Sequence, residues 1–235
     1  MSPNYPKESL QFYCDPWWVR AGDQQLRRGC LLWSVLPHVD QHPNVLIVKG
    51  RSEATEHRFA DFEIQALQGN RLPAGSDLPV TGLPHYAGEA RLVYRAKKRP
   101  ALVISTGGTD VPKSLRTGSA RYQTNTTMLV APYYGADLGG KTGGWRPEFV
   151  ERIRRCEYPQ YMWDSLPLGG REESILRLDH IQPLGRHGES YELTEYVLGE
   201  EAMLLLDDYL DWLIQGEIPA GSVLRDVRTA LLGLG

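Results

Sequence analysis

The sequence predicts a mainly β fold that ends with a C-terminal helix. Several short apolar stretches are separated by turn residues such as glycine and proline, which is typical of antiparallel strands. One long stretch with helical periodicity follows them near the C-terminus. This order of elements favours a small barrel or two packed antiparallel sheets.

Length and charge limit the classes of protein to consider. The 235 residues fit one large domain, or a small domain with insertions. Hydrophobic residues make up 41% of the chain and charged residues 23%, values that allow a buried core. The formal net charge of −3 gives no overall attraction to nucleic acid. A role on nucleic acid therefore needs a local basic patch.

The chain lacks the segments that mark membrane and secreted proteins. No apolar run approaches the roughly 20 residues that span a bilayer, and the first residues have no apolar core of the signal-peptide kind. The cysteines, Cys14, Cys30 and Cys156, are odd in number and widely spaced, which fits neither a disulfide framework nor a zinc motif. We expect a cytoplasmic protein with reduced thiols, no membrane segment and no bound metal.

The N-terminal part predicts an arm followed by a strand. Residues 1–25 hold three prolines and a pair of tryptophans, and we expect them to pack on the domain as an extension. Residues 27–36 (RRGCLLWSVL) are an apolar run that Pro37 stops, which indicates a strand. Residues 38–90 differ in character and are interpreted as an insertion.

Within this insertion, two apolar stretches have more than one interpretation. Residues 44–49 (NVLIVK) and 58–67 (RFADFEIQAL) predict a hairpin, because apolar side chains alternate in the second stretch. The second stretch also fits a helix, since its two phenylalanines share a helical face. Residues 69–88 are rich in proline and glycine and predict a loop.

A basic loop that runs into a buried strand is the most distinctive stretch of the chain. Residues 97–105 (KKRPALVIS) place Pro100 at the strand entrance, where its missing N–H costs the ladder least. Residues 105–127 are a polar loop, and residues 127–134 (TMLVAPYY) predict the next strand. The glycine-rich residues 135–144 again predict a loop.

The next part mixes one helix with further strands. Residues 147–156 (PEFVERIRRC) predict a short basic helix with proline in its first turn. Residues 158–166 are aromatic, and residues 174–184 (SILRLDHIQPL) predict a continuous strand. Residues 191–197 predict one more short strand.

The clearest helix is predicted at residues 199–215. Its apolar residues recur at helical spacing and form one stripe, made by Ala202, Leu205, Leu206, Tyr209 and Leu213. Gly216 follows as a C-cap residue. Residues 217–235 are expected as a C-terminal tail or a short helix.

The best catalytic candidate lies in the predicted strand 174–184. Residues two apart in a strand point to the same face, so Arg177 and Asp179 project together while His180 points to the other face. A cation beside a carboxylate suits proton transfer and charge stabilisation on a phosphodiester. The alternative is a surface ion pair, which contributes roughly 0–1 kcal/mol to stability.

Four stretches, in order, resemble the MazF/PemK-type toxins of bacterial toxin–antitoxin systems. Residues 27–36 resemble the first strand of that family, residues 97–105 resemble its Arg-Pro motif before an apolar strand, and residues 129–135 (LVAPYYG) resemble the strand that ends in a proline turn. Tyr158-Pro159, followed by residues 174–184, resembles the Tyr-Pro strand and the strand that carries an aspartate. The predicted helix from Gly199 fits the closing helix of the family.

The resemblance implies an SH3-like small barrel of the MazF/PemK/CcdB type. Residues 26–216 would form this single barrel domain, with the insertion at 38–90. Members of the family act as homodimers, and many cleave single-stranded RNA without a metal or other cofactor. The RNA 2′-OH is then the nucleophile, and a 2′,3′-cyclic phosphate is the product. An antitoxin protein is the further partner that the resemblance implies.

The resemblance also assigns roles to residues. Asp179 would be the general base on the 2′-OH, Arg177 would stabilise the phosphorane, and Arg99 would hold a phosphate. Further contacts to RNA are expected from Lys97, Lys98, Tyr134, Arg152 and Arg155. Tyr134 stands where the family often carries serine or threonine just after the proline turn.

An alternative class of function is a barrel that has lost catalysis. Such a protein would bind nucleic acid or a protein partner within a defence or regulatory system. Tyr134 in place of the hydroxyl residue, the acidic net charge and the insertion favour this alternative.

Overall fold

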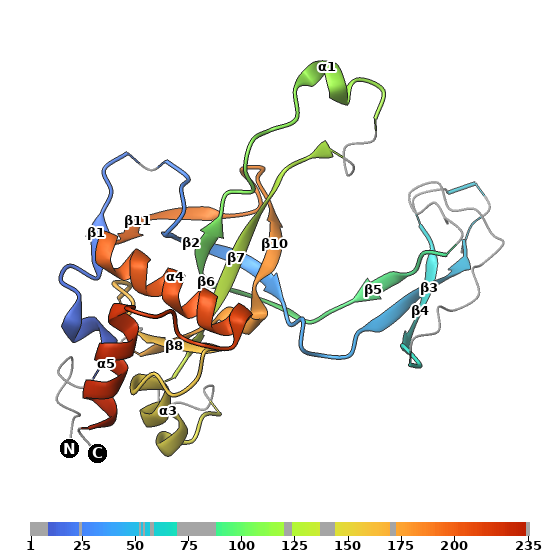
Figure 1. The fold of residues 1–235 in the computed structure, drawn as a ribbon. Coiled ribbons are helices and arrows are strands. Elements are labelled where there is room, and N and C mark those ends of the chain that lie inside the picture. Colours follow the sequence, from blue (N-terminus) through green and yellow to red (C-terminus); the bar gives the residue numbers. More distant parts are fainter. Residues whose placement is uncertain are drawn as a thin grey trace. The chain divides into compact units, whose positions relative to one another are not determined.

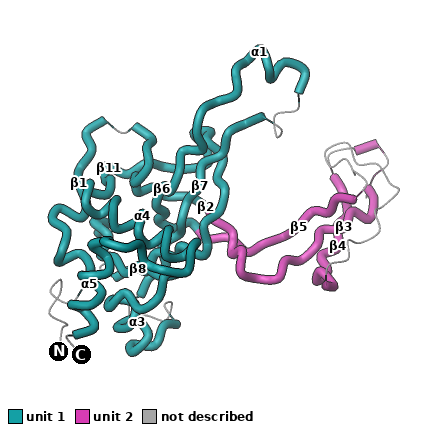
Figure 2. Tube along the Cα trace, viewed as in Figure 1, with its two compact units in different colours: residues 1–35, 98–235 teal, residues 36–97 magenta. Residues whose placement is uncertain are grey.

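The computed structural model divides the chain into two compact units. Unit 1 contains residues 1–35 and 98–235, and unit 2 contains residues 36–97 (Figure 2). The structure describes residues 9–23, 25–51, 53, 55–56, 59–69, 88–119, 124–136, 144–169 and 173–233. Most of the predicted loops 69–88 and 135–144 and part of the N-terminal arm therefore lie outside the described residues.

Unit 1 is built on an eight-stranded sheet with the strand order β1-β11-β2-β6-β7-β9-β8, and β10 pairs with β7 (Figure 1). The strands are β1 (Trp18–Arg20), β2 (Cys30–Pro37), β6 (Ala96–Ser105), β7 (Thr127–Gly135), β8 (Tyr161–Asp164), β9 (Ser174–Arg177), β10 (Gln182–Gly185) and β11 (Glu192–Leu198). The pairs with a defined register are antiparallel. Within the described residues the path of pairs stays open from β1 to β8, so the sheet is not a closed barrel.

Helices of different lengths accompany this sheet. They are η1 (Leu10–Tyr13), α1 (Lys113–Arg116), α3 (Pro147–Arg154), η2 (Leu178–His180), α4 (Glu200–Gln215) and α5 (Val223–Leu232). The predicted helix at 199–215 is confirmed as α4, which ends at Gly216 in the left-handed conformation, with φ of 84°. Glycine adopts this conformation without the steric cost that a Cβ atom brings.

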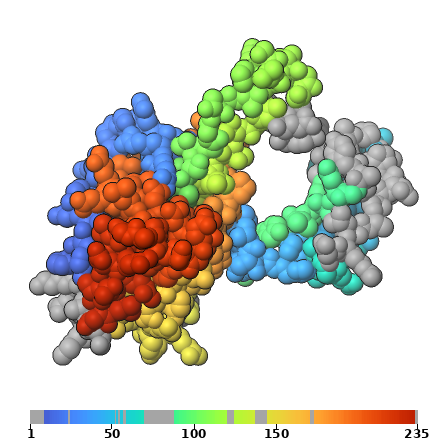
Figure 3. Space-filling view, viewed as in Figure 1, coloured from blue at the N-terminus to red at the C-terminus, as the bar shows by residue number. Residues whose placement is uncertain are grey.

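The two faces of the sheet carry different cores, because side chains alternate along each strand. On β7, Tyr133 is 1% exposed and joins the core that also contains Leu205 and Leu224 from α4 and α5. Figure 3 shows α4 and α5 covering this side of unit 1. On the other face, Ile153 of α3 packs with Ile175 of β9.

A buried carboxylate ties the N-terminal segment to the sheet. Asp164, at the end of β8, is 0% exposed. Its Oδ1 accepts hydrogen bonds from Gln11 Nε2 at 2.6 Å and Trp18 Nε1 at 3.0 Å, and Tyr133 Oη donates to Oδ2 at 2.7 Å. Burial raises the pKa of Asp164 to about 6, and these hydrogen bonds offset that effect only in part.

Unit 2 is a three-stranded antiparallel sheet. Its strands β3 (Asn44–Gly50), β4 (Asp61–Ala66) and β5 (Arg91–Val93) lie in the order β4-β3-β5. The hairpin prediction for 44–49 and 58–67 is therefore right, and the helix alternative is wrong. The segment follows the alternation of its apolar residues and not the helical spacing of its two phenylalanines. Pairing with β3 gives the backbone N–H and C=O groups of β4 their hydrogen bonds.

The prediction of a continuous strand at residues 174–184 is wrong. The segment forms β9, then η2, then β10. Both strands pair with the same partner, β7. Leu176 lies opposite Tyr133 and Gln182 lies opposite Val130, so six steps along this segment span three steps along β7. The three extra residues bulge out of the ladder as η2. A bulge of this kind redirects side chains that strict alternation would send elsewhere.

Candidate functional site

A cluster of polar side chains lies at the η2 bulge and comes from neighbouring strands. Tyr134 of β7 lies opposite Ile175 of β9, and Arg177 lies two residues further along β9, on the same face. Arg177 in turn lies opposite Tyr161 of β8. Arg99 of β6 completes the cluster, with its Cζ atom 4.2 Å from the centre of the Tyr134 ring.

Arg177 and Asp179 form a two-pronged ion pair. Arg177 Nε donates to Asp179 Oδ1 at 2.7 Å, and Arg177 Nη2 donates to Asp179 Oδ2 at 2.7 Å. The side chains are 16% and 29% exposed, so both reach the surface. Burial lowers the pKa of Arg177, but the hydrogen bonds and charge of Asp179 raise it more, and the guanidinium stays charged.

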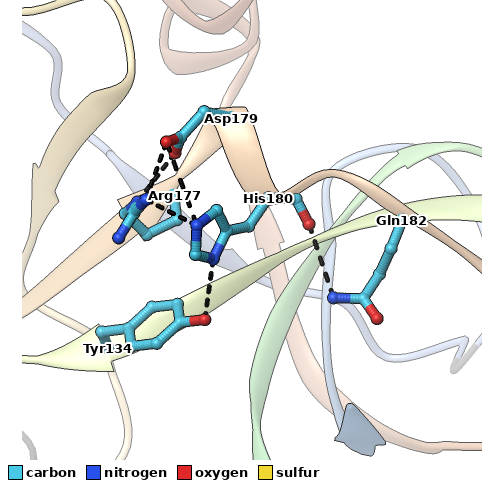
Figure 4. A network of polar contacts seen from close by, with 5 residues as sticks. All are labelled: Tyr134, Arg177, Asp179, His180 and Gln182. Atoms are coloured by element: carbon cyan, nitrogen blue, oxygen red, sulfur yellow. Dashed lines mark hydrogen bonds and ion pairs between the residues drawn. The ribbon is translucent and has the colours of Figure 1, made fainter. Parts of the chain in front are cut away.

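His180 joins this pair to Tyr134. Its Nε2 lies 2.5 Å from Arg177 Nη2, and its Nδ1 lies 2.9 Å from Tyr134 Oη (Figure 4). A guanidinium only donates hydrogen bonds, so Nε2 must accept, and the proton of the neutral ring is on Nδ1. His180 therefore donates from Nδ1 to the phenol oxygen of Tyr134.

Two further contacts hold this part of the bulge. His180 is 5% exposed, and its backbone oxygen lies 3.5 Å from Nε2 of Gln182, which donates to it. Gln182 is itself 5% exposed and begins β10. The imidazole is therefore fixed at both ring nitrogens and through its backbone.

The cluster carries one net positive charge. Arg99 and Arg177 contribute two cations, Asp179 contributes one anion, and the tautomer of His180 is neutral. Arg177 also lies over two aromatic rings, 5.7 Å from the centre of the Tyr134 ring and 4.8 Å from that of Tyr161. A site with this charge and an exposed carboxylate edge suits a phosphodiester group.

The structure brings together four of the residues selected from the sequence and adds a fifth. Arg99, Tyr134, Arg177 and Asp179 meet as described, whereas alternation along a straight strand predicts His180 on the opposite face. That prediction is wrong, because η2 turns His180 towards Tyr134. The sequence offers one hint of the turn, the proline that follows Gln182.

The remaining basic candidates have partners elsewhere. Lys98 pairs with Glu192 at 2.7 Å. On α3, Arg152 pairs with Glu157 at 2.7 Å and Arg155 pairs with Glu151 at 3.2 Å. Lys97 is exposed and belongs to unit 2. These four residues are surface cations, and none of them takes part in the contacts described for the cluster.

Half-buried aromatic side chains extend from the cluster along α3. Tyr161 packs edge-on against Phe149 at 5.4 Å between ring centres, and Phe149 stacks on Trp145 at 5.6 Å. Tyr158 lies 5.3 Å from Phe149 and carries Arg152 over its ring at 4.9 Å. This patch offers rings of the kind on which the bases of single-stranded nucleic acid stack.

Among the described residues, the cysteines and the acidic and histidine side chains outside the cluster form no reactive-thiol or metal site. Cys14, Cys30 and Cys156 are buried free thiols, and burial raises the pKa of Cys14 and of Cys156 to about 11. The described residues contain no group of three or more histidine, cysteine, aspartate or glutamate side chains that could hold a metal ion. None of the described helices has the length and apolar character needed to cross a membrane.

No protein-family model matches the chain, and no curated protein matches it.

Proposed function

We propose that this protein is an endoribonuclease that cleaves single-stranded RNA through the RNA's own 2′-OH. The observation that carries the proposal is the cluster at η2, where a carboxylate is held by one arginine beside a second arginine. Transesterification at a phosphodiester needs a base for the nucleophile and cations for the developing charge. Asp179, Arg177 and Arg99 supply these groups without a metal ion.

In this proposal each residue has one task. Asp179 removes the proton of the 2′-OH through a carboxylate lone pair that Arg177 does not occupy. The 2′-oxygen attacks the phosphorus, the P–O5′ bond breaks, and a 2′,3′-cyclic phosphate and a 5′-OH form. Arg177 and Arg99 stabilise the phosphorane, in which negative charge accumulates on the non-bridging oxygens.

We further propose that unit 1 is an enlarged and opened relative of the SH3-like barrel of the MazF/PemK type, since its sheet does not close within the described residues. The order of β2, β6, β7 and β9, followed by α4 as a closing helix, supports this assignment. On this proposal the protein acts in the cytoplasm as a homodimer, and an antitoxin protein restrains it. Unit 2 is then the insertion, since residues 36–97 span the stretch 38–90.

A second candidate function is RNA or protein binding without turnover. The observation that favours it is the engagement of Asp179, because each of its two oxygens accepts a hydrogen bond from Arg177. A carboxylate engaged in this way has fewer lone pairs open to a substrate hydroxyl. Tyr134 in place of the family's hydroxyl residue supports the same candidate.

Incubation of the purified protein with unstructured RNAs in EDTA tests both candidates. We expect cleavage that leaves cyclic-phosphate and 5′-OH ends, and none at a linkage whose 2′-OH is replaced by hydrogen. Asp179→Asn keeps the shape of the side chain and should abolish cleavage, whereas Asp23→Asn, which removes a surface carboxylate paired with Arg27, is the matched charge-removal control. Tight binding of RNA without cleavage would instead establish the second candidate.

A further inference from the structure

We propose that Tyr134 is the general acid that protonates the 5′-oxygen as it leaves, and that His180 positions it. This inference rests on the proposed function, because it assigns the second proton transfer of the same reaction. The proposal starts from the arrangement of the two proton-carrying groups around the imidazole. It gives a role to the tyrosine that stands in place of the family's smaller hydroxyl residue.

Asp179 and Tyr134 lie at opposite ends of the His180 ring. Asp179 Oδ2 is 4.0 Å from Nε2, and Tyr134 Oη is 2.9 Å from Nδ1, so the width of the imidazole separates the carboxylate from the phenol (Figure 4). In phosphoryl transfer the attacking and leaving oxygens lie roughly in line, on opposite sides of the phosphorus. With this separation, the base can take the proton of the attacking oxygen while the acid gives a proton to the leaving oxygen.

The other members of the cluster are poor acids. Arg99 and Arg177 keep their protons because a guanidinium is too strong a base to release one near neutral pH. His180 has both nitrogens engaged, one with Arg177 and one with Tyr134, and its side chain is 6% exposed. Among these five residues, Tyr134 is the hydroxyl donor, and it is only half-buried.

The surroundings of Tyr134 favour release of its proton. His180 Nδ1–H donates to the phenol oxygen, and this hydrogen bond strengthens when the oxygen becomes a phenolate. Arg99 at 4.2 Å and Arg177 at 5.7 Å from the ring centre place positive charge against the same ring. All three contacts stabilise negative charge that appears on Tyr134 during the reaction.

The proton balance of the step is closed. Asp179 takes the proton of the 2′-OH as the 2′-O–P bond forms, and Tyr134 gives its proton to the 5′-oxygen as the P–O5′ bond breaks. The products are the cyclic phosphate and a neutral 5′-OH. Exchange with water then returns a proton to Tyr134 and removes the one on Asp179.

A substrate with a 5′-bridging sulfur separates the acid from the rest of the site. The linkage that the wild-type protein cleaves is synthesised with sulfur in place of the 5′-oxygen. A thiol has a pKa of about 8.5, so the sulfur leaves as a thiolate without an acid. We expect Tyr134→Phe to lower kcat/KM on the oxygen substrate by about 10² to 10⁴ and on the sulfur substrate by less than about tenfold.

Matched variants make the result decisive. Asp179→Asn should lose activity on both substrates, because the base is needed for either leaving group. Tyr196→Phe, on β11 beside Arg20, removes a phenol far from the cluster in the strand order and should leave both rates unchanged. The circular dichroism of Tyr134→Phe is compared with that of the wild type, and Tyr134→His, which keeps a proton donor, should restore part of the oxygen rate.

Two results would overturn the inference, and they can be told apart. An equal loss on both substrates by Tyr134→Phe would show that Tyr134 acts in binding or folding, while the proposed ribonuclease function stands. No cleavage of either substrate by the wild-type protein would overturn the proposed function and the inference together.

Discussion

The buried carboxylate of Asp164 makes the stability of the protein depend on pH. Asp164 is 0% exposed, and burial raises its pKa from 3.8 to about 6. The folded state therefore holds this proton more tightly than the unfolded state. The stabilising effect of protonation is complete below pH 4, decreases as the pH rises from about 4 to about 6, and is absent above that range.

The size of the effect follows from the shift. The pKa of Asp164 rises by roughly two, which corresponds to about 3 kcal/mol because a pKa difference of one is equivalent to about 1.4 kcal/mol. Asp164→Asn provides the matched perturbation, because asparagine resembles the protonated acid. Its oxygen still accepts from Gln11 and Trp18, and its amide donates to the phenol oxygen of Tyr133, which reverses the third hydrogen bond.

Urea unfolding of wild type and Asp164→Asn from pH 4.5 to 7.5 measures this difference directly. Other titrating groups contribute equally to both proteins and cancel in the comparison. We expect the variant to gain about 2 kcal/mol relative to wild type as the pH rises from 4.5 to about 6, since each pH unit in that range corresponds to about 1.4 kcal/mol. A difference that stays constant from pH 4.5 to 7.5 would refute the reasoning, because Asp164 would then titrate alike in both states.

Of three further predictions, two concern the cluster and one concerns the close approach of Gly199 to Pro16. Arg177→Lys keeps the charge but loses the two-pronged pair, so RNA cleavage should fall about 10² to 10³-fold; an unchanged kcat/KM would contradict this. His180→Asn places an amide N–H near the position of Nδ1 and should keep more activity than His180→Ala; equal loss would argue against the contact with Tyr134. Gly199→Ala directs a methyl group at the carbonyl oxygen of Pro16, so thermal unfolding should show a loss of about 1–3 kcal/mol, and none would contradict the packing.

The parts of the fold that local patterns determine were predictable from the sequence. The stripe of α4 and the strand beginning at Cys30 follow from hydrophobic periodicity and from the proline and glycine that end them. The adjacency of Arg177 and Asp179 was also predictable, because residues two apart share a face of a strand. In the structure they meet for a different reason, since Asp179 lies on a turn after the strand has ended.

The position of His180 was not predictable because it depends on register. The three extra residues of η2 arise from where β9 and β10 each pair along β7, and that pairing brings together residues about 50 positions apart. A local pattern contains no information on such a mismatch. The pairing of Arg155 with Glu151, by contrast, is readable from their spacing of four on a helix.

The bulge at η2 separates the requirements of folding from those of chemistry. β9 and β10 are each anchored by their own ladder with β7, and Leu178 of the bulge is buried in the core, so the exposed position 179 can change in identity without moving either strand. Evolution can therefore alter what this surface does while the sheet that displays it stays intact. Substitution at position 179 offers the same freedom to an engineer who wishes to give this scaffold a different specificity.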